Sequence, residues 1–110
     1  MGRIITLYVI NAMRYYIAMI ISFKDKKTEQ LSHNERVKDF ESFERVALRK
    51  LRQLQIATCL DDLKVPPGNQ LESLRGNRRG QYSIRINDQF RICFRWTEAG
   101  AEDVEIVDYH

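Results

Sequence analysis

The sequence predicts an α+β fold in which an N-terminal strand and helices pack on a mainly antiparallel sheet. Two observations lead to this prediction. Residues 37–56 have helical periodicity, whereas the chain from residue 70 onward alternates between apolar and polar side chains as strands do. Consecutive strands joined by short turns pair in antiparallel fashion, and a helix with one apolar stripe covers a sheet face. The length of 110 residues fits one domain.

Residues 1–18 form an apolar stretch that Asn11 and Arg14 interrupt. The stretch is too short and too polar to span a bilayer, and it lacks the small-residue cleavage site of a signal peptide. A strand-like run opens at Met19. We therefore expect residues 1–18 to be an upstream extension and residues 19–110 to be the domain, the alternative being an extra strand or helix that packs on the fold.

The first half of the domain is predicted to be a strand followed by helices. Residues 20–23 are apolar and β-branched and predict a strand, and the charged residues 24–31 predict a turn or short helix. Ser32 and Glu35 fit a capping box for the main helix, 37–56. Apolar residues at helical spacing predict its buried stripe: Phe40, Phe43, Ala47, Leu51 and Leu54. The basic residues are expected to form its solvated face: Arg36, Lys38, Arg45, Arg49, Lys50 and Arg52.

The second half is predicted to be strands. Thr58 is expected to cap a short helix that ends at Leu63, and Pro66-Pro67-Gly68 then redirects the chain. Alternation predicts strands at residues 71–74, 81–86, 90–96 and 104–109. The turns between them are predicted at residues 76–80, 87–89 and 98–102, where glycine, asparagine and aspartate gather.

Six arginines and one acid stand between positions 75 and 95: Arg75, Arg78, Arg79, Arg85, Asp88, Arg91 and Arg95. Strand alternation turns one side of the sheet toward the helix, with Tyr82, Ile84, Ile86, Phe90, Ile92, Phe94 and Trp96. It turns the other side away, with Ser83, Arg85, Arg91, Cys93 and Arg95. Guanidinium groups bind phosphate through paired hydrogen bonds and stay charged. The pattern therefore favours a phosphate-binding face, although charged solvent-side strand positions are also common without any function.

Composition limits the other classes of function. The net charge of +3 is weak support for nucleic-acid binding by itself, because many soluble proteins reach it. Cys59 and Cys93 are too few for a disulfide framework or a zinc site, which indicates the reducing cytosol. His33 and His110 lie far apart with no cluster of ligands around them, so we expect neither a metal nor a cofactor.

Several segments together resemble a known family. They are LESLRGNRRGQYSIRINDQFRICFRW, VEIVDYH, CLDDLKVPPGN and the helix ERVALRKL. These segments are similar to the HigB toxins of type II toxin–antitoxin systems, which belong to the RelE/ParE superfamily. The likeness spans residues 19–110 and extends to the GraT-type branch, which carries similar PPGN, SIR-ND and VEIVDYH elements.

The resemblance implies a compact RelE-like fold and a ribosome-dependent mRNA endonuclease that acts in the cytoplasm without a metal. It also implies a HigA-type helix-turn-helix antitoxin as partner. The matching catalytic positions are Arg75, Arg91, Asp108, Tyr109 and His110. Several HigB toxins have a histidine where this chain has Glu72, which makes Glu72 a candidate substitute base.

Within this hypothesis the remaining arginines are expected to hold RNA: Arg78, Arg79, Arg85 and Arg95. Two alternatives stay open at the level of the sequence. One is a ParE-like toxin that acts on DNA gyrase without cutting RNA. The other is a non-catalytic, basic RNA-binding module.

Overall fold

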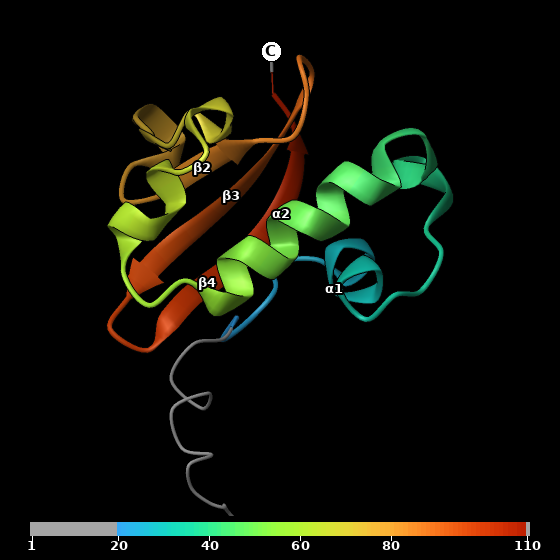
Figure 1. Ribbon diagram of the computed structural model, residues 1–110, viewed down its shortest axis with the longest axis horizontal. Coiled ribbons are helices and arrows are strands. Elements are labelled where there is room, and N and C mark those ends of the chain that lie inside the picture. Colours follow the sequence, from blue (N-terminus) through green and yellow to red (C-terminus); the bar gives the residue numbers. More distant parts are fainter. Residues whose placement is uncertain (1–19, 110) are drawn as a thin grey trace, which may run out of the picture.

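The computed structural model describes residues 20–109, which form an antiparallel sheet with helices packed against it (Figure 1). The sheet has four strands in the order β1-β2-β3-β4. Their bounds are Glu72–Ser73, Tyr82–Arg85, Phe90–Thr97 and Gly100–Asp108. The predicted α+β class is thereby confirmed. The predictions on residues 1–18 and on His110 lie outside the described residues.

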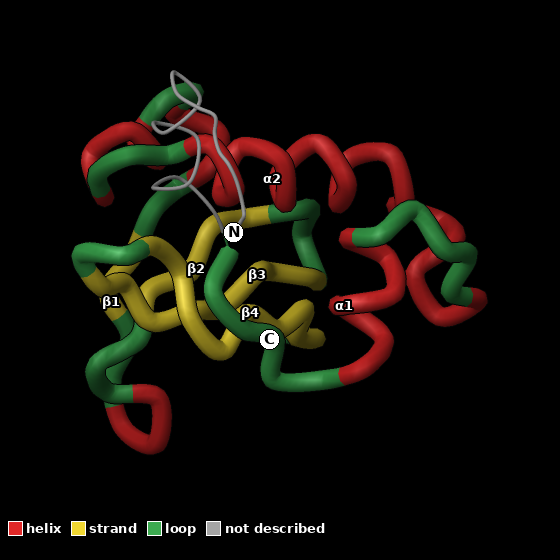
Figure 2. The backbone as a smooth tube through the Cα atoms, turned by 90° about the horizontal axis from the view of Figure 1, so that it is seen from below, coloured by secondary structure: helices red, strands yellow, loops and turns green. Residues whose placement is uncertain are grey.

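Helix α2, Glu44–Ile56, lies across one face of the sheet, and helix α1, Lys26–Ser32, lies beside it (Figures 1 and 2). Short 3-10 turns occupy much of the remaining chain. They are η3 Lys38–Phe43, η4 Leu60–Lys64, η5 Pro67–Asn69 and η6 Gly76–Arg78.

The core forms between α2 and the sheet, as the two periodicities predict. Ala47, Leu51 and Leu54 of α2 are almost fully buried, together with the apolar side of β2 and β3. Phe43 packs on Phe90, with 4.4 Å between the ring centroids. The predicted helix-side residues of the sheet are therefore confirmed, because all of them are buried or pack on this core.

The predicted strand at residues 20–23 is reduced to two isolated bridges with β4, Ile20 with Ala101 and Phe23 with Val104. Unlike the rest of the sheet, these bridges are parallel. Nearby, the hydroxyl of Thr28 in α1 accepts a hydrogen bond from the Ile106 backbone N–H at 3.0 Å. The N-terminal part of the described chain is therefore fastened to β4 at several points.

The predicted capping box at Ser32 and Glu35 is wrong. Ser32 ends α1, whose N-cap is Asp25: its carboxylate accepts a hydrogen bond from the Thr28 N–H at 3.0 Å. Asn34 then turns the chain with a φ of 66°. The predicted continuous helix 37–56 instead begins as η3 and becomes α-helical only at Glu44.

Two further predicted boundaries differ. Cys59, not Thr58, precedes the short helix, and the Thr58 hydroxyl donates to Asp62 at 3.2 Å. Strand β4 begins at Gly100, within the segment that was predicted to be a turn.

The early start of β4 depends on an irregularity at Asp103, whose φ is 52°. Pairing between β3 and β4 shifts between Cys93 and Arg95. Ala101 and Val104 stand three positions apart, so a regular strand would place them on opposite faces. The shift allows both to be fully buried in the core. It also places Glu102 and Asp103 close to the arginines of β3, because Arg95 is paired with Glu102.

Candidate nucleic-acid interface

The candidate site occupies the sheet face opposite α2. Figure 2 shows α2 on one side of the strands, with the turn η6 extending from the other side near β1. Pairing aligns Glu72 of β1 with Ser83 of β2, and Ser83 with Cys93 of β3. Residues aligned across a sheet share a face, so β1, β2 and β3 bring polar side chains to one surface.

Arg91 is the centre of this surface, although it is less accessible than its outward position suggests, with only 8% of its area exposed. Its Nε donates to the Ser83 hydroxyl at 2.7 Å, and its Nη2 donates to the backbone carbonyl of Gln70. Nη1 makes no hydrogen bond within the described residues. The guanidinium is therefore fixed in one orientation by two of its three nitrogens. The predicted position of Arg91 on the face away from the helix therefore does not make it an exposed cation.

Glu72 faces Arg91. Its Oε1 lies 4.0 Å from Arg91 Nη2, and 52% of its side chain is exposed. The structure therefore brings together two of the predicted catalytic residues, one acidic and one basic. The exposed carboxylate of Glu72 therefore lies within reach of a ligand that binds beside the held guanidinium.

Strand β4 and the β2–β3 turn supply acids that pair with three of the predicted RNA-binding arginines. Arg78 Nη1 lies 3.3 Å from Glu105 Oε1, and Arg95 Nε lies 3.6 Å from Asp103 Oδ2. Arg85 pairs with Asp88. The surface is therefore of mixed charge. The excess of six arginines over one acid between residues 75 and 95 does not describe it, because acids from β4 lie beside these arginines.

Arg75 and Arg79 differ from the other arginines. Both are exposed, and neither makes an ion pair or a side-chain hydrogen bond within residues 20–109. They flank η6, whose first residue, Gly76, has a φ of 61°. The turn extends beyond the plane of the sheet, and the two exposed arginines that flank it are available to bind an anion.

Asp108 and Tyr109 extend the pairing of β4 with β3. Asp108 is paired with Phe90, and its Oδ2 accepts a hydrogen bond from Gln89 Nε2 at 3.0 Å. The Tyr109 N–H donates to the Gln89 carbonyl at 2.7 Å. The backbone is thus held as far as Tyr109, and Figure 1 shows this end of the chain beside the turn between β2 and β3.

Three residues in or near the site were missed or misplaced by sequence reasoning. Ser83 was recognised only as an outward-facing strand residue, and Gln70 only as the start of the part of the chain with a strand pattern. Lys50 was assigned to the solvated face of the helix, and that assignment is wrong: it is 8% exposed and donates to Asn69.

Cys93 lies on the same face but is unsuited to nucleophilic chemistry. It is fully buried, and burial raises the pKa of its thiol against the opposing effect of Arg78. A thiol with a raised pKa stays protonated near neutral pH and is a poor nucleophile. The prediction that Cys93 is an ordinary strand residue is therefore supported.

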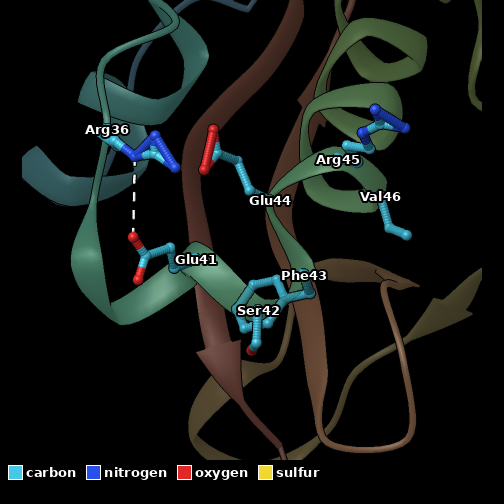
Figure 3. Close-up of a pocket in the computed structure, with 7 residues that line it drawn as sticks. All are labelled: Arg36, Glu41, Ser42, Phe43, Glu44, Arg45 and Val46. Atoms are coloured by element: carbon cyan, nitrogen blue, oxygen red, sulfur yellow. Dashed lines mark ion pairs between the residues drawn. The ribbon is translucent and has the colours of Figure 1, made fainter.

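Two hollows of the described surface lie away from this face. One pocket surrounds the start of α2, where Arg36 and Glu41 form an ion pair at 3.8 Å and Phe43 lies below (Figure 3). None of its lining residues belongs to the predicted site. Among residues 20–109, no group of three or more His, Cys, Asp or Glu side chains is placed to hold a metal ion. No helix in this part of the chain is both long and apolar enough to span a membrane.

Comparison with known proteins agrees with the resemblance. Residues 21–110 match the family described as RelE-like toxin of type II toxin-antitoxin system HigB. The toxin HigB-1 of Vibrio cholerae is 40% identical over 85 residues, which cover 76% of this chain and 90% of that protein. An uncharacterized protein of Haemophilus influenzae is 36% identical over 52 residues, covering 47% of this chain and 52% of that protein. The chain therefore belongs to the HigB family of type II toxins, which are RelE-like mRNA interferases.

Proposed function

We propose that this toxin cleaves mRNA on the translating ribosome and uses the face around Arg91 as its active site. The observation that carries the proposal is the guanidinium of Arg91, fixed by Ser83 and Gln70 with the carboxylate of Glu72 4.0 Å away. A held cation with an unused nitrogen provides the preorganised charge that a phosphate transition state needs.

RNA cleavage of this type needs a base to remove the ribose 2′-OH proton and an acid to protonate the departing 5′ oxygen. We assign stabilisation of the phosphate charge to Arg91 and Arg75. His110 and Tyr109 would transfer or orient protons, with Asp108 to position them. Glu72 is the second candidate for the base, supported by its place beside Arg91.

We further propose that the reaction needs no metal ion. Supporting this, the chain supplies groups for both tasks that a metal often performs. Guanidinium groups stabilise the charge on phosphate, and side chains of Glu72, Tyr109 and His110 are available for proton transfer. Toxin that is stripped with EDTA and desalted before it meets the ribosomes should cleave at the same rate as untreated toxin, which tests for a metal ion carried by the toxin itself.

Arg75→Ala should separate catalysis from stability. We expect primer extension on translated mRNA to show cleavage reduced by about 10²-fold or more, because a cation that stabilises transition-state charge is lost. The melting temperature should not change, since Arg75 is exposed and unpaired within residues 20–109. Lys38→Ala removes an exposed cation of η3, which is outside the predicted site, and is the control.

Expression of the wild-type chain, followed by primer extension, DNA supercoiling and RNA-binding measurements, tests the alternatives. Growth arrest without any new mRNA ends, accompanied by loss of DNA supercoiling, would favour action on gyrase and contradict the proposal. RNA binding without cleavage would favour a simple binding module. Membership of a family of mRNA interferases supports cleavage over both.

The other arginines are proposed to hold RNA to different degrees. Arg79 is exposed and unpaired in the described chain, whereas Arg78, Arg85 and Arg95 are each paired with an acid. A paired arginine must exchange its carboxylate for phosphate, which reduces its net contribution. Arg79 should therefore contribute most to binding in this group.

A type II toxin implies a cognate antitoxin, and we propose a HigA-type helix-turn-helix protein for this role. Co-expression should restore growth, and the two proteins should co-purify through an affinity tag on either one. A toxin variant, Arg75→Ala, should still co-purify, because binding should not require an intact catalytic centre. A chain that is harmless when expressed alone and that captures no neighbouring gene product would contradict this proposal.

Three narrower assignments belong with the proposed function. We propose that residues 19–110 are the toxin domain, which the family match over residues 21–110 supports. The PPGN, SIR-ND and VEIVDYH segments support placement in the GraT-type branch. Action in the cytoplasm follows from the proposed substrate, which is mRNA under translation.

A further inference from the structure

Lys50 is the most unusual buried group outside the proposed active site. It lies on α2 with 8% of its area exposed, and it makes no ion pair with any acid in residues 20–109. Burial, and then the positive charges of Arg49 and Arg85, lower the pKa of Lys50. Burying an ammonium group without a carboxylate is unfavourable, so efficient packing alone does not account for a lysine here.

The partner of Lys50 is Asn69, which is completely buried at the end of η5. Asn69 Oδ1 accepts from Lys50 Nζ. Its Nδ2 donates to Gln53 Oε1 at 3.1 Å and to the Leu63 carbonyl at 3.0 Å. Both ends of the amide are thus used, and two residues of α2 fix the loop that precedes β1.

The residue after Asn69 connects this loop to the active site. Gln70 has the left-handed backbone conformation, with φ of 45° and ψ of 58°, which is unfavourable for a residue with a side chain. Its carbonyl accepts the hydrogen bond from Arg91 Nη2. A strained backbone conformation that persists beside a fixed functional group indicates that this conformation serves the function of the group.

We propose that Lys50 is a positioning residue for Arg91, acting through Asn69 and the Gln70 carbonyl. Lys50 itself is too buried to contact RNA, but it fixes the loop whose carbonyl sets the angle of the guanidinium. Ser83 holds the other side of the same group. The role in catalysis rests on the proposed function, whereas the role in orienting Arg91 is a structural property that is tested separately.

The structural arm uses the NMR signal of the Arg91 Nη2–H group, which donates to the Gln70 carbonyl, in the purified full-length protein. Lys50→Met keeps most of the side-chain volume and removes the charge and the donor. We expect it to shift this signal and to speed its exchange with water, because the Gln70 carbonyl is no longer fixed. Lys38→Met makes the same chemical change at an exposed site and should leave the signal in place.

The catalytic arm measures single-turnover cleavage of ribosome-bound mRNA. We expect Lys50→Met to lower the maximal rate about tenfold or more, as misplacement of a catalytic group does. The ribosome concentration for half-maximal rate should stay within about twofold, because the substrate-binding surface is intact. In an Arg91→Lys background, Lys50→Met should lower the maximal rate almost no further. The guanidinium that the Gln70 carbonyl orients is already absent from that background.

The outcomes separate the two proposals. An unchanged Arg91 signal in folded Lys50→Met would overturn the inference, and so would rate losses that multiply in the double variant. If the wild-type chain does not cut mRNA, the proposed function fails, and the NMR arm alone decides the role of Lys50. If Lys50→Met does not fold, Lys50→Gln takes its place. The glutamine side chain is shorter than lysine but its amide still donates a hydrogen bond, so the Arg91 signal should shift less and in the same direction.

Discussion

Replacing Arg91 by alanine should remove mRNA cleavage and also destabilise the protein. The loss of transition-state stabilisation is expected to lower the single-turnover rate by about 10²–10³-fold. The free energy of unfolding should fall by about 1–3 kcal/mol, because the Gln70 carbonyl and the Ser83 hydroxyl lose their partner in a largely buried place. Cleavage assays and urea denaturation measure the two effects.

Ser83→Ala separates the two effects of Arg91→Ala. It removes one of the hydrogen bonds that fix the guanidinium but retains the cation, so stability should fall while the cleavage rate falls by less than in Arg91→Ala. Circular dichroism shows whether each variant remains folded. Full cleavage by a folded Arg91→Ala variant would remove this residue from the mechanism and shift phosphate binding to Arg75.

Deleting His110 should lower cleavage by about 10²-fold or more, the effect expected for losing a general acid or base. Its own position lies outside the described residues, but the preceding backbone is held, since the Tyr109 N–H donates to the Gln89 carbonyl. A proton-transfer group needs such support to reach a ribose hydroxyl. Ribosome and antitoxin binding should be retained, because the arginine surface is unaltered.

His110→Gln keeps the chain length and should reproduce the loss caused by deletion. His33→Gln removes the other histidine, which is exposed beyond the end of α1 and has its ring 6.3 Å from that of Phe23, and should cleave normally. An unchanged rate for both His110 variants would assign proton transfer to Glu72 and Tyr109.

The fold was largely predictable because its main signals are local. The stripe of Ala47, Leu51 and Leu54 repeats within one helix, and the alternation of β2 and β3 is visible in consecutive residues. A residue's burial in such elements depends on its own periodicity. The same alternation correctly predicted that Arg91 lies on the sheet face away from α2.

The site was only partly predictable because its contacts join distant segments. Glu105 neutralises Arg78 from 27 positions away, and Asn69 buries Lys50 from 19 positions away. Neither contact leaves a pattern in a short window of sequence. The shift at Asp103, which brings acids beside the arginines of β3, likewise follows from core packing at Ala101 and Val104.

The attachment of the first described segment to β4 has a consequence for how the protein folds. The Asp103 N–H donates to the Ser22 hydroxyl across 81 positions, and the Ile106 N–H donates to Thr28 across 78. Contacts between such distant positions are slow to form, because the loop between them must close first. The hairpin of β3 and β4 should thus assemble early, with residues 20–28 docking on it late. Amide protons bonded to this segment, including that of Ile106, should exchange with solvent sooner than those between β3 and β4.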